Sequence, residues 1–139
     1  MTGDQRELVR QTFDQIAPIA DQAAELFYGR LFDIDPATRV LFRGDMKQQG
    51  KKVMQVLGYC VSRLDHTETL SATLHDLGRR HARYGVPADS YDTVGAALLW
   101  TLEQGLGAAF TPAARDAWGC LYQDLAGSMK EGARAAETD

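Results

Sequence analysis

The spacing of apolar residues is the feature that most limits what this chain can fold into. Leu70, Leu74 and Leu77 recur at three- and four-residue intervals, which places them on one face of an α-helix. No stretch alternates apolar and polar residues between turn signals, and no Asn-Gly or Asp-Gly pair marks a β-hairpin. The sequence therefore predicts an all-α fold.

Prolines and capping side chains indicate where the helices begin. Pro36 and Pro112 each follow a good N-cap residue, Asp35 and Thr111, and a capping box begins at Thr2. We expect helices at 4–17, 18–33, 36–42, 47–64, 68–83, 89–107 and 112–133, with the longest loops at 43–46 and 84–88 and a frayed tail at 133–139.

Length, composition and charge exclude several classes of protein. The 139 residues, 45% hydrophobic and 24% charged, predict a single globular domain rather than a disordered chain. The net charge of −4 argues against a nucleic-acid partner. No apolar run is long enough to span a membrane, and the polar N-terminus lacks a signal-peptide core, so we expect a cytoplasmic protein. Cys60 and Cys120 form no CxxC or CxxCH motif, which excludes a structural zinc site, a disulfide framework and covalent haem attachment.

One polar residue interrupts the apolar face of the fifth expected helix. His81 falls on the same side as Leu74, Leu77 and Tyr84, whereas His75 falls on the opposite, solvated side. An inward histidine is either a core residue whose ring nitrogens are satisfied by neighbours, or a ligand for a metal or haem iron. Neutral imidazole is the commonest metal-binding side chain, so both interpretations stay open on this pattern.

Two further polar side chains are expected inside the fold. Gln49 lies on an apolar stripe with Met46 and Val53, so its amide either reaches solvent at the helix start or has a partner inside. Tyr28 lies in a segment that is apolar around most of its circumference, so its hydroxyl needs a partner, in the simplest case a backbone carbonyl. An all-α chain with one inward histidine and two inward donors suggests a haem pocket, with the haem held noncovalently as b-type.

Six stretches, in this order, match one protein family: LFYGRLF (26–32), DPATRVLF (35–42), KVMQVLG (52–58), LHDLGRRHARYGV (74–86), YDTVGAALL (91–99) and AWGCLYQDLA (117–126). With them the chain resembles the globins, specifically the single-domain bacterial globins related to the globin half of flavohaemoglobins. The resemblance implies a globin fold, a three-over-three helical sandwich around a b-type haem, with residues 1–139 as a single globin domain.

The resemblance also implies roles for individual residues. His81 matches the proximal ligand of the haem iron, and Tyr28 and Gln49 match the distal pair that contacts a bound ligand. Further haem contacts are implied for Phe42, Val53, Leu57, Leu77, Arg80, Val86, Tyr91 and Val94.

The chain departs from the flavohaemoglobin pattern at one position near its end. Flavohaemoglobins carry a glutamate there that polarises the proximal histidine, whereas this chain has Ala135, flanked by Glu131 and Glu137. The chain also contains no Gly-Gly pair, which argues against the truncated globins.

Two functions follow from the resemblance. In the first, the protein binds O2, NO, CO or another small haem ligand, and Tyr28 and Gln49 stabilise bound O2 through hydrogen bonds. In the second, it is a nitric oxide dioxygenase that depends on a separate NAD(P)H-dependent reductase, since these 139 residues contain no FAD or nucleotide-binding segment. A cofactor-free helical interaction domain is a third possibility, and it leaves the inward polar residues unexplained.

Overall fold

Six α-helices and three short 3₁₀ helices make up the described part of the chain. The structure is a computed structural model that describes residues 1–42 and 44–138, except for the side chains of 136–138. The α-helices are α1 (Gly3–Ile16), α2 (Ala20–Ile34), α3 (Met46–Ser62), α4 (Thr67–Arg83), α5 (Ser90–Leu106) and α6 (Pro112–Thr138). The 3₁₀ helices are η1 (Ala17–Ile19), η2 (Pro36–Leu41) and η3 (Gly107–Ala109). Residues 1–42 and 44–138 contain no strand, so the predicted all-α class is confirmed.

The helices begin where the capping residues predict. The Thr2 hydroxyl accepts a hydrogen bond of 3.1 Å from the backbone N–H of Gln5, whose side chain accepts one in return, which completes the capping box. The Thr111 hydroxyl accepts from the backbone N–H of Ala114 at 3.1 Å. In both places the side chain satisfies a backbone donor that the helix itself leaves unpaired.

Three of the expected boundaries are wrong. Pro18 lies in η1 and does not start a helix, and α2 begins at Ala20. The segment expected as a helix at 36–42 is the 3₁₀ helix η2. The tail does not fray from residue 133, because α6 continues to Thr138 through three alanines, which favour helix, and residue 139 of the expected tail lies outside the described residues. Of the expected loop at 43–46, Arg43 lies outside the described residues.

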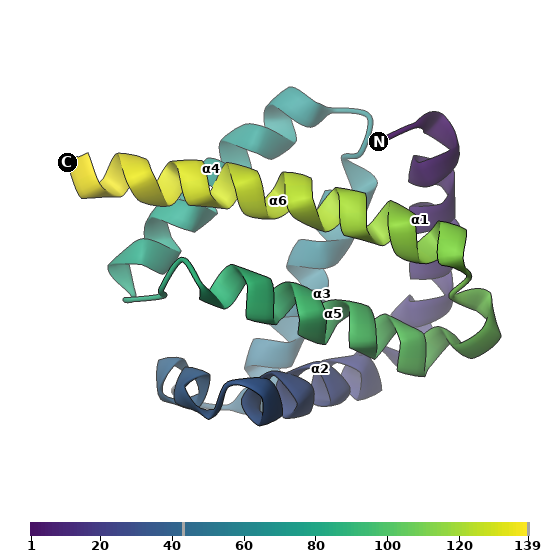
Figure 1. The fold of residues 1–139 in the computed structure, drawn as a ribbon, viewed down its shortest axis with the longest axis horizontal. Helices are drawn as coiled ribbons and strands as arrows, with labels where there is room; N and C mark the ends of the chain where they lie inside the picture. Colours follow the sequence, from purple (N-terminus) through teal and green to yellow (C-terminus); the bar gives the residue numbers. More distant parts are fainter. Residues whose placement is uncertain (43, 139) are drawn as a thin grey trace.

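The main packing contacts join helices that are distant in the sequence. In Figure 1, α5 and α6 lie side by side across the front, while α3 and α4 lie behind them. Most contacts between helices are made by α4 on α6, α2 on α5, α1 on α6 and α2 on α3. By contrast, the backbones of α3 and α4 approach each other at few points, and the two helices meet through Cys60, Leu70 and Leu74 of the core and through a 3.3 Å hydrogen bond between the Tyr59 and Thr73 hydroxyls.

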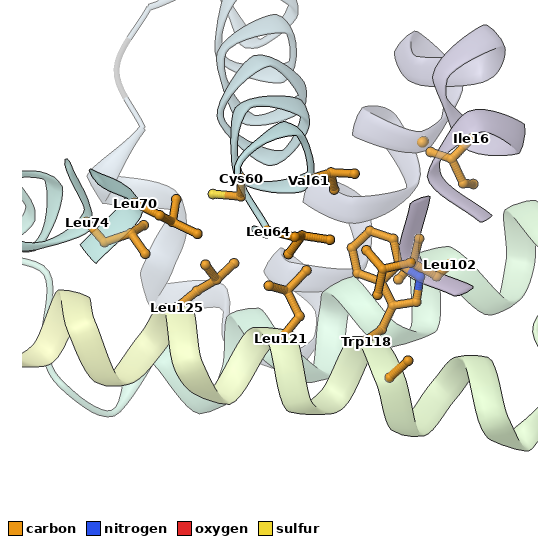
Figure 2. Close-up of a cluster of buried hydrophobic side chains, with 13 residues drawn as sticks. Ile16, Cys60, Val61, Leu64, Leu70, Leu74, Leu102, Trp118, Leu121 and Leu125 are labelled. Atoms are coloured by element: carbon orange, nitrogen blue, oxygen red, sulfur yellow. The ribbon is translucent and has the colours of Figure 1, made fainter. Parts of the chain in front are cut away.

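The largest hydrophobic cluster lies between α6 and α3, where Trp118, Leu121 and Leu125 of α6 point toward Cys60 and Val61 (Figure 2). Trp118 at its centre is fully buried, and its indole N–H donates to the Thr12 hydroxyl at 2.8 Å. The cluster draws on five helices through Ile16, Cys60, Val61, Leu64, Leu70, Leu74, Leu102, Trp118, Leu121 and Leu125. A second, smaller cluster of Phe27, Tyr28, Leu31 and Ala97 joins α2 to α5.

Two glycines bring the backbones of α4 and α6 into direct contact. A Cβ atom added to Gly78 would lie 1.9 Å from the carbonyl oxygen of Met129. A Cβ atom added to Gly132 would lie 1.9 Å from the carbonyl oxygen of His75. Since only glycine lacks a Cβ, the two helices can approach this closely only with glycine at both positions.

This contact predicts a large cost for Gly78→Ala. The added methyl group meets backbone rather than a flexible side chain, so we expect a loss of at least about 1–3 kcal/mol in the free energy of unfolding. Gly127→Ala on α6 is the matched control, since a Cβ there meets nothing within 4 Å. It should be neutral or stabilising by roughly 0.5–1 kcal/mol. Urea unfolding of the apoprotein measures both, and equal midpoints would contradict the close contact.

Candidate functional site

His81 on α4 has one ring nitrogen fixed and the other free. Its Nδ1 lies 2.7 Å from the carbonyl oxygen of Leu77. A carbonyl oxygen can only accept, so Nδ1 carries the proton and Nε2 presents its lone pair. Within the described residues Nε2 has no hydrogen-bond partner, and the side chain is half-buried. This is the tautomer in which a histidine can bind a metal through Nε2 while a second group holds its ring in place.

The turn that follows α4 is hydrogen-bonded to the backbone carbonyl of His81. The backbone N–H groups of Tyr84 and Val86 both donate to the His81 carbonyl at 3.1 Å. Gly85 adopts φ 84°, a left-handed conformation that favours glycine and allows the chain to reverse here. The backbone that carries His81 is therefore restrained on both sides.

The apolar face of α4 ends at His81. Tyr84 was expected to continue it, but at the C-cap of α4 its side chain is 73% exposed. Arg80 is also exposed, and its guanidinium pairs with Asp76 at 2.8 Å. Leu77 is half-buried at the edge of the large cluster.

Tyr28 on α2 is held among aromatic rings. It is 8% exposed, and the rings of Phe27 and Phe42 meet it edge-on with centroids at 5.1 Å. Phe32 stacks on it at 6.0 Å. Burial raises the pKa of Tyr28 to about 12. The phenol is therefore protonated at neutral pH and is available as a hydrogen-bond donor in a largely apolar environment.

The structure brings Tyr28 and Gln49 together. The Tyr28 hydroxyl donates to the backbone carbonyl of Gln49 at 3.4 Å, which is long for a hydrogen bond of this kind. The two helices approach at Gly50, where an added Cβ would lie 2.8 Å from Cβ of Ala24. The Gln49 side chain is half-buried. A backbone carbonyl is the partner that the sequence analysis named as the simplest one for the Tyr28 hydroxyl. This hydrogen bond is therefore compatible both with a structural tyrosine in the core and with a donor to a bound ligand.

The predicted apolar contacts divide between the two hydrophobic clusters. Phe42, Val53 and Val94 are partly buried against the cluster that contains Tyr28. Leu57 and Leu77 are partly buried against the larger cluster.

Between α3 and α4 lies a cavity of about 220 Å³. It is lined by Gln55, Val56, Tyr59, Cys60, Thr73, Leu74 and Leu77. Apolar side chains thus face a space between α3 and α4 that the chain itself does not fill.

Tyr91 at the start of α5 has a buried hydroxyl without a partner. The residue is 8% exposed, and its hydroxyl oxygen makes no hydrogen bond within the described residues. Burial raises its pKa, so the phenol is neutral at physiological pH. An unpaired buried hydroxyl is costly and calls for an explanation, such as a bound group. Val86 in the preceding loop is half-buried.

The sequence analysis did not identify the residues that pack around Tyr91. The Tyr122 hydroxyl donates to the carbonyl of Tyr91, and Gly95 leaves room for the Tyr122 ring, since an added Cβ would lie 2.6 Å from it. Lys130 Nζ lies 5.7 Å above the centre of the Tyr91 ring. No spacing along the chain signals these contacts, because they join α5 to α6 across the fold.

Glu131 does not take the place of the flavohaemoglobin glutamate in this structure. Its carboxylate lies 2.9 Å from Nε2 of His75, on the exposed side of α4, and so is engaged away from His81. The side chain of Glu137 lies outside the described residues.

Comparison with known proteins decides the family. The sequence profile of the Globin family matches residues 25–129. This chain belongs to the globin family. The predicted globin fold is thereby confirmed, and membership implies a haem iron as cofactor and O2 and other small diatomic molecules as ligands.

The globin is similar to fish neuroglobins over nearly its whole length. It is 30% identical to the neuroglobin of Tetraodon nigroviridis over 95% of this chain and 92% of that protein. It is 32% identical to the neuroglobin of Danio rerio over 90% of this chain and 87% of that protein. These matches support a globin, whereas the narrower likeness to bacterial globins and flavohaemoglobins stays a prediction.

The residues present fit a haem. His81 offers one free imidazole nitrogen, and the porphyrin supplies the other nitrogen ligands. The unpaired buried hydroxyl of Tyr91 and the half-buried apolar residues of α3 and α4 are suited to a flat, mostly apolar group.

Within the described residues, no helix is both long and apolar enough to cross a membrane.

Proposed function

We propose that this globin binds O2 and related diatomic ligands on a noncovalent b-type haem held through Nε2 of His81. The observation that carries the proposal is the hydrogen bond from His81 Nδ1 to the Leu77 carbonyl, which leaves Nε2 free as a ligand. When bound, the haem supplies an iron with one open position for a small ligand.

On the proximal side, the chain fixes the position of the imidazole. The Leu77 carbonyl holds the ring in one tautomer and one orientation, and the closed turn after His81 restrains its backbone. Leu77, Val86, Tyr91 and Val94 are proposed as contacts of the haem on this side. Arg80 is proposed as a cation near the haem carboxylates. Its exposed pair with Asp76 is worth little and can be exchanged for another anion.

On the distal side, Tyr28 and Gln49 are proposed as donors to bound O2. Tyr28 is protonated and packed among aromatic rings, so turning its hydroxyl toward a ligand costs little conformational entropy. A donor to a charged oxygen contributes roughly 1.5–3 kcal/mol. Phe42, Val53 and Leu57 are proposed to exclude water from the distal side of the haem, which strengthens a hydrogen bond from Tyr28 or Gln49 to bound O2. CO develops less negative charge than O2 and gains less from the same donors.

His81→Ala should abolish stable haem incorporation, because no other histidine shares its position. His75→Ala should bind haem in the same stoichiometry as the unaltered protein, since His75 lies on the exposed side of α4 and pairs with Glu131. The Soret absorption of the purified variants after haem titration measures both. A His75 variant that took up no haem in this titration while His81 remained would overturn the assignment.

Tyr28→Phe should release O2 about tenfold faster or more, on the basis of 1.4 kcal/mol per decade. The ring and its aromatic contacts remain, so packing is little changed. Gln49→Leu should have the smaller effect, because the glutamine side chain loses more rotamers when it donates. Stopped-flow measurement of O2 dissociation compares the variants, and an unchanged rate in Tyr28→Phe would argue for a purely structural tyrosine.

The proximity of Tyr28 to Gln49 also favours a second candidate, nitric oxide dioxygenase. The reaction NO + O2 + e⁻ → NO3⁻ consumes one electron per turnover, which a separate NAD(P)H-dependent reductase would supply. We expect the oxygenated protein to consume about one equivalent of NO per haem and then stop, until a reductase and NADH are added. An NO electrode follows the consumption. If the first equivalent is not consumed, ligand binding alone stands as the function.

A further inference from the structure

The helix that carries His81 is attached to the rest of the fold mainly through α6. Its first half contributes Leu70 and Leu74 to the large cluster, where Figure 2 shows them facing Leu125. Its second half approaches α6 backbone to backbone at Gly78. Contacts between α4 and α3 are few, so α6 is the surface against which the position of His81 is set.

One side-chain hydrogen bond joins α4 to α6 on the exposed side of their contact. Nε2 of His75 lies 2.9 Å from a carboxylate oxygen of Glu131, and the two side chains are 42% and 60% exposed. With its proton on Nε2, a neutral His75 donates to Glu131, so the bond does not depend on a charged imidazole. Gly132, the residue after Glu131, is the one whose added Cβ would meet the His75 carbonyl. The bond therefore joins α4 to α6 at the point of closest approach.

His75 and His81 project from different sides of the same rigid helix. At about 3.6 residues per turn, six residues separate them by roughly one and two-thirds turns. Loss of the bond between His75 and Glu131 would let α4 rotate slightly about its axis against α6, within the limits set by Leu70 and Leu74 in the large cluster and by the hydrogen bond between the Tyr59 and Thr73 hydroxyls. Such a roll moves the His81 ring relative to α3 and α5.

We infer that His75 and Glu131 are positioning residues that fix the roll of α4 and thereby the approach of His81 Nε2 to the haem iron. The inference rests on the proposed function, because it takes His81 as the iron ligand. It assigns to Glu131 an indirect effect on the proximal ligand, through helix position rather than through contact with His81.

Glu131→Ala tests this role, with Glu131→Gln as the conservative variant that keeps an acceptor oxygen for His75. Glu103→Ala is the matched control, since it breaks another exposed pair that involves α6, the one between Glu103 and Arg115 at 3.6 Å. The resonance Raman band of the iron–histidine bond in the ferrous, ligand-free protein is the first readout. The rate of haem loss to an excess of a haem-scavenging apoprotein is the second.

We expect Glu131→Ala to shift or broaden the iron–histidine band and to speed haem loss roughly two- to tenfold, the factor that corresponds to one ordinary hydrogen bond. Glu131→Gln should stay close to the unaltered protein, and Glu103→Ala should change neither readout. His75→Ala removes the same bond from the side of α4 and should reproduce the effect, including where Glu131→Ala folds poorly.

An unmoved band in both Glu131→Ala and His75→Ala would overturn the inference, even if urea unfolding showed a loss of stability. An equal shift in Glu103→Ala would overturn it as well. The proposed function fails separately, through the absence of Soret absorption or of an iron–histidine band in the unaltered protein.

Discussion

The close backbone contact between α4 and α6 is the constraint on which the site depends. Gly78 and Gly132 remove the side chains that would hold the two helices apart. The contact allows α4 to be anchored on one side only, with few contacts to α3. A cavity remains between α3 and α4. The large cluster is still well packed, because Leu70 and Leu74 in the first half of α4 belong to it (Figure 2).

A site that binds O2 on a haem has to satisfy two opposed requirements. Apolar walls favour a flat hydrophobic group and exclude water, whereas bound O2 is stabilised by hydrogen-bond donors. Tyr28 reconciles the two, since its ring belongs to an aromatic cluster and only its hydroxyl is polar. On the other side, the Leu77 carbonyl satisfies one nitrogen of His81 and leaves the second for a ligand.

Local signals in the sequence were sufficient for most helix starts and for the inward residues. Thr2 and Thr111 cap helices as predicted, because capping depends on residues only two or three positions away. The apolar period of α4 correctly indicated that Leu74 is buried in the core and that His81 is half-buried. It failed at Tyr84, whose side chain is exposed at the C-cap of α4 although it continues the apolar spacing.

The contacts between distant segments were not predictable in the same way. Gly78 and Gly132 look like weak points in two helices until their backbones are seen together. The sequence shows Glu131 near the expected place of a proximal glutamate, but only the fold shows that it reaches His75 instead.

The long hydrogen bond of Tyr28 bears on how the pocket would discriminate between ligands. A hydroxyl that already has a strong partner gains little by turning to a ligand, whereas the 3.4 Å bond to the Gln49 carbonyl is easily given up. The carbonyl that loses this donor belongs to Gln49, whose half-buried side chain is proposed as the second donor. Tyr28 and Gln49 would then act together, and the stabilisation that they give would depend on the negative charge of the bound ligand. The pair would therefore favour O2 over CO by more than the sum of two independent donors.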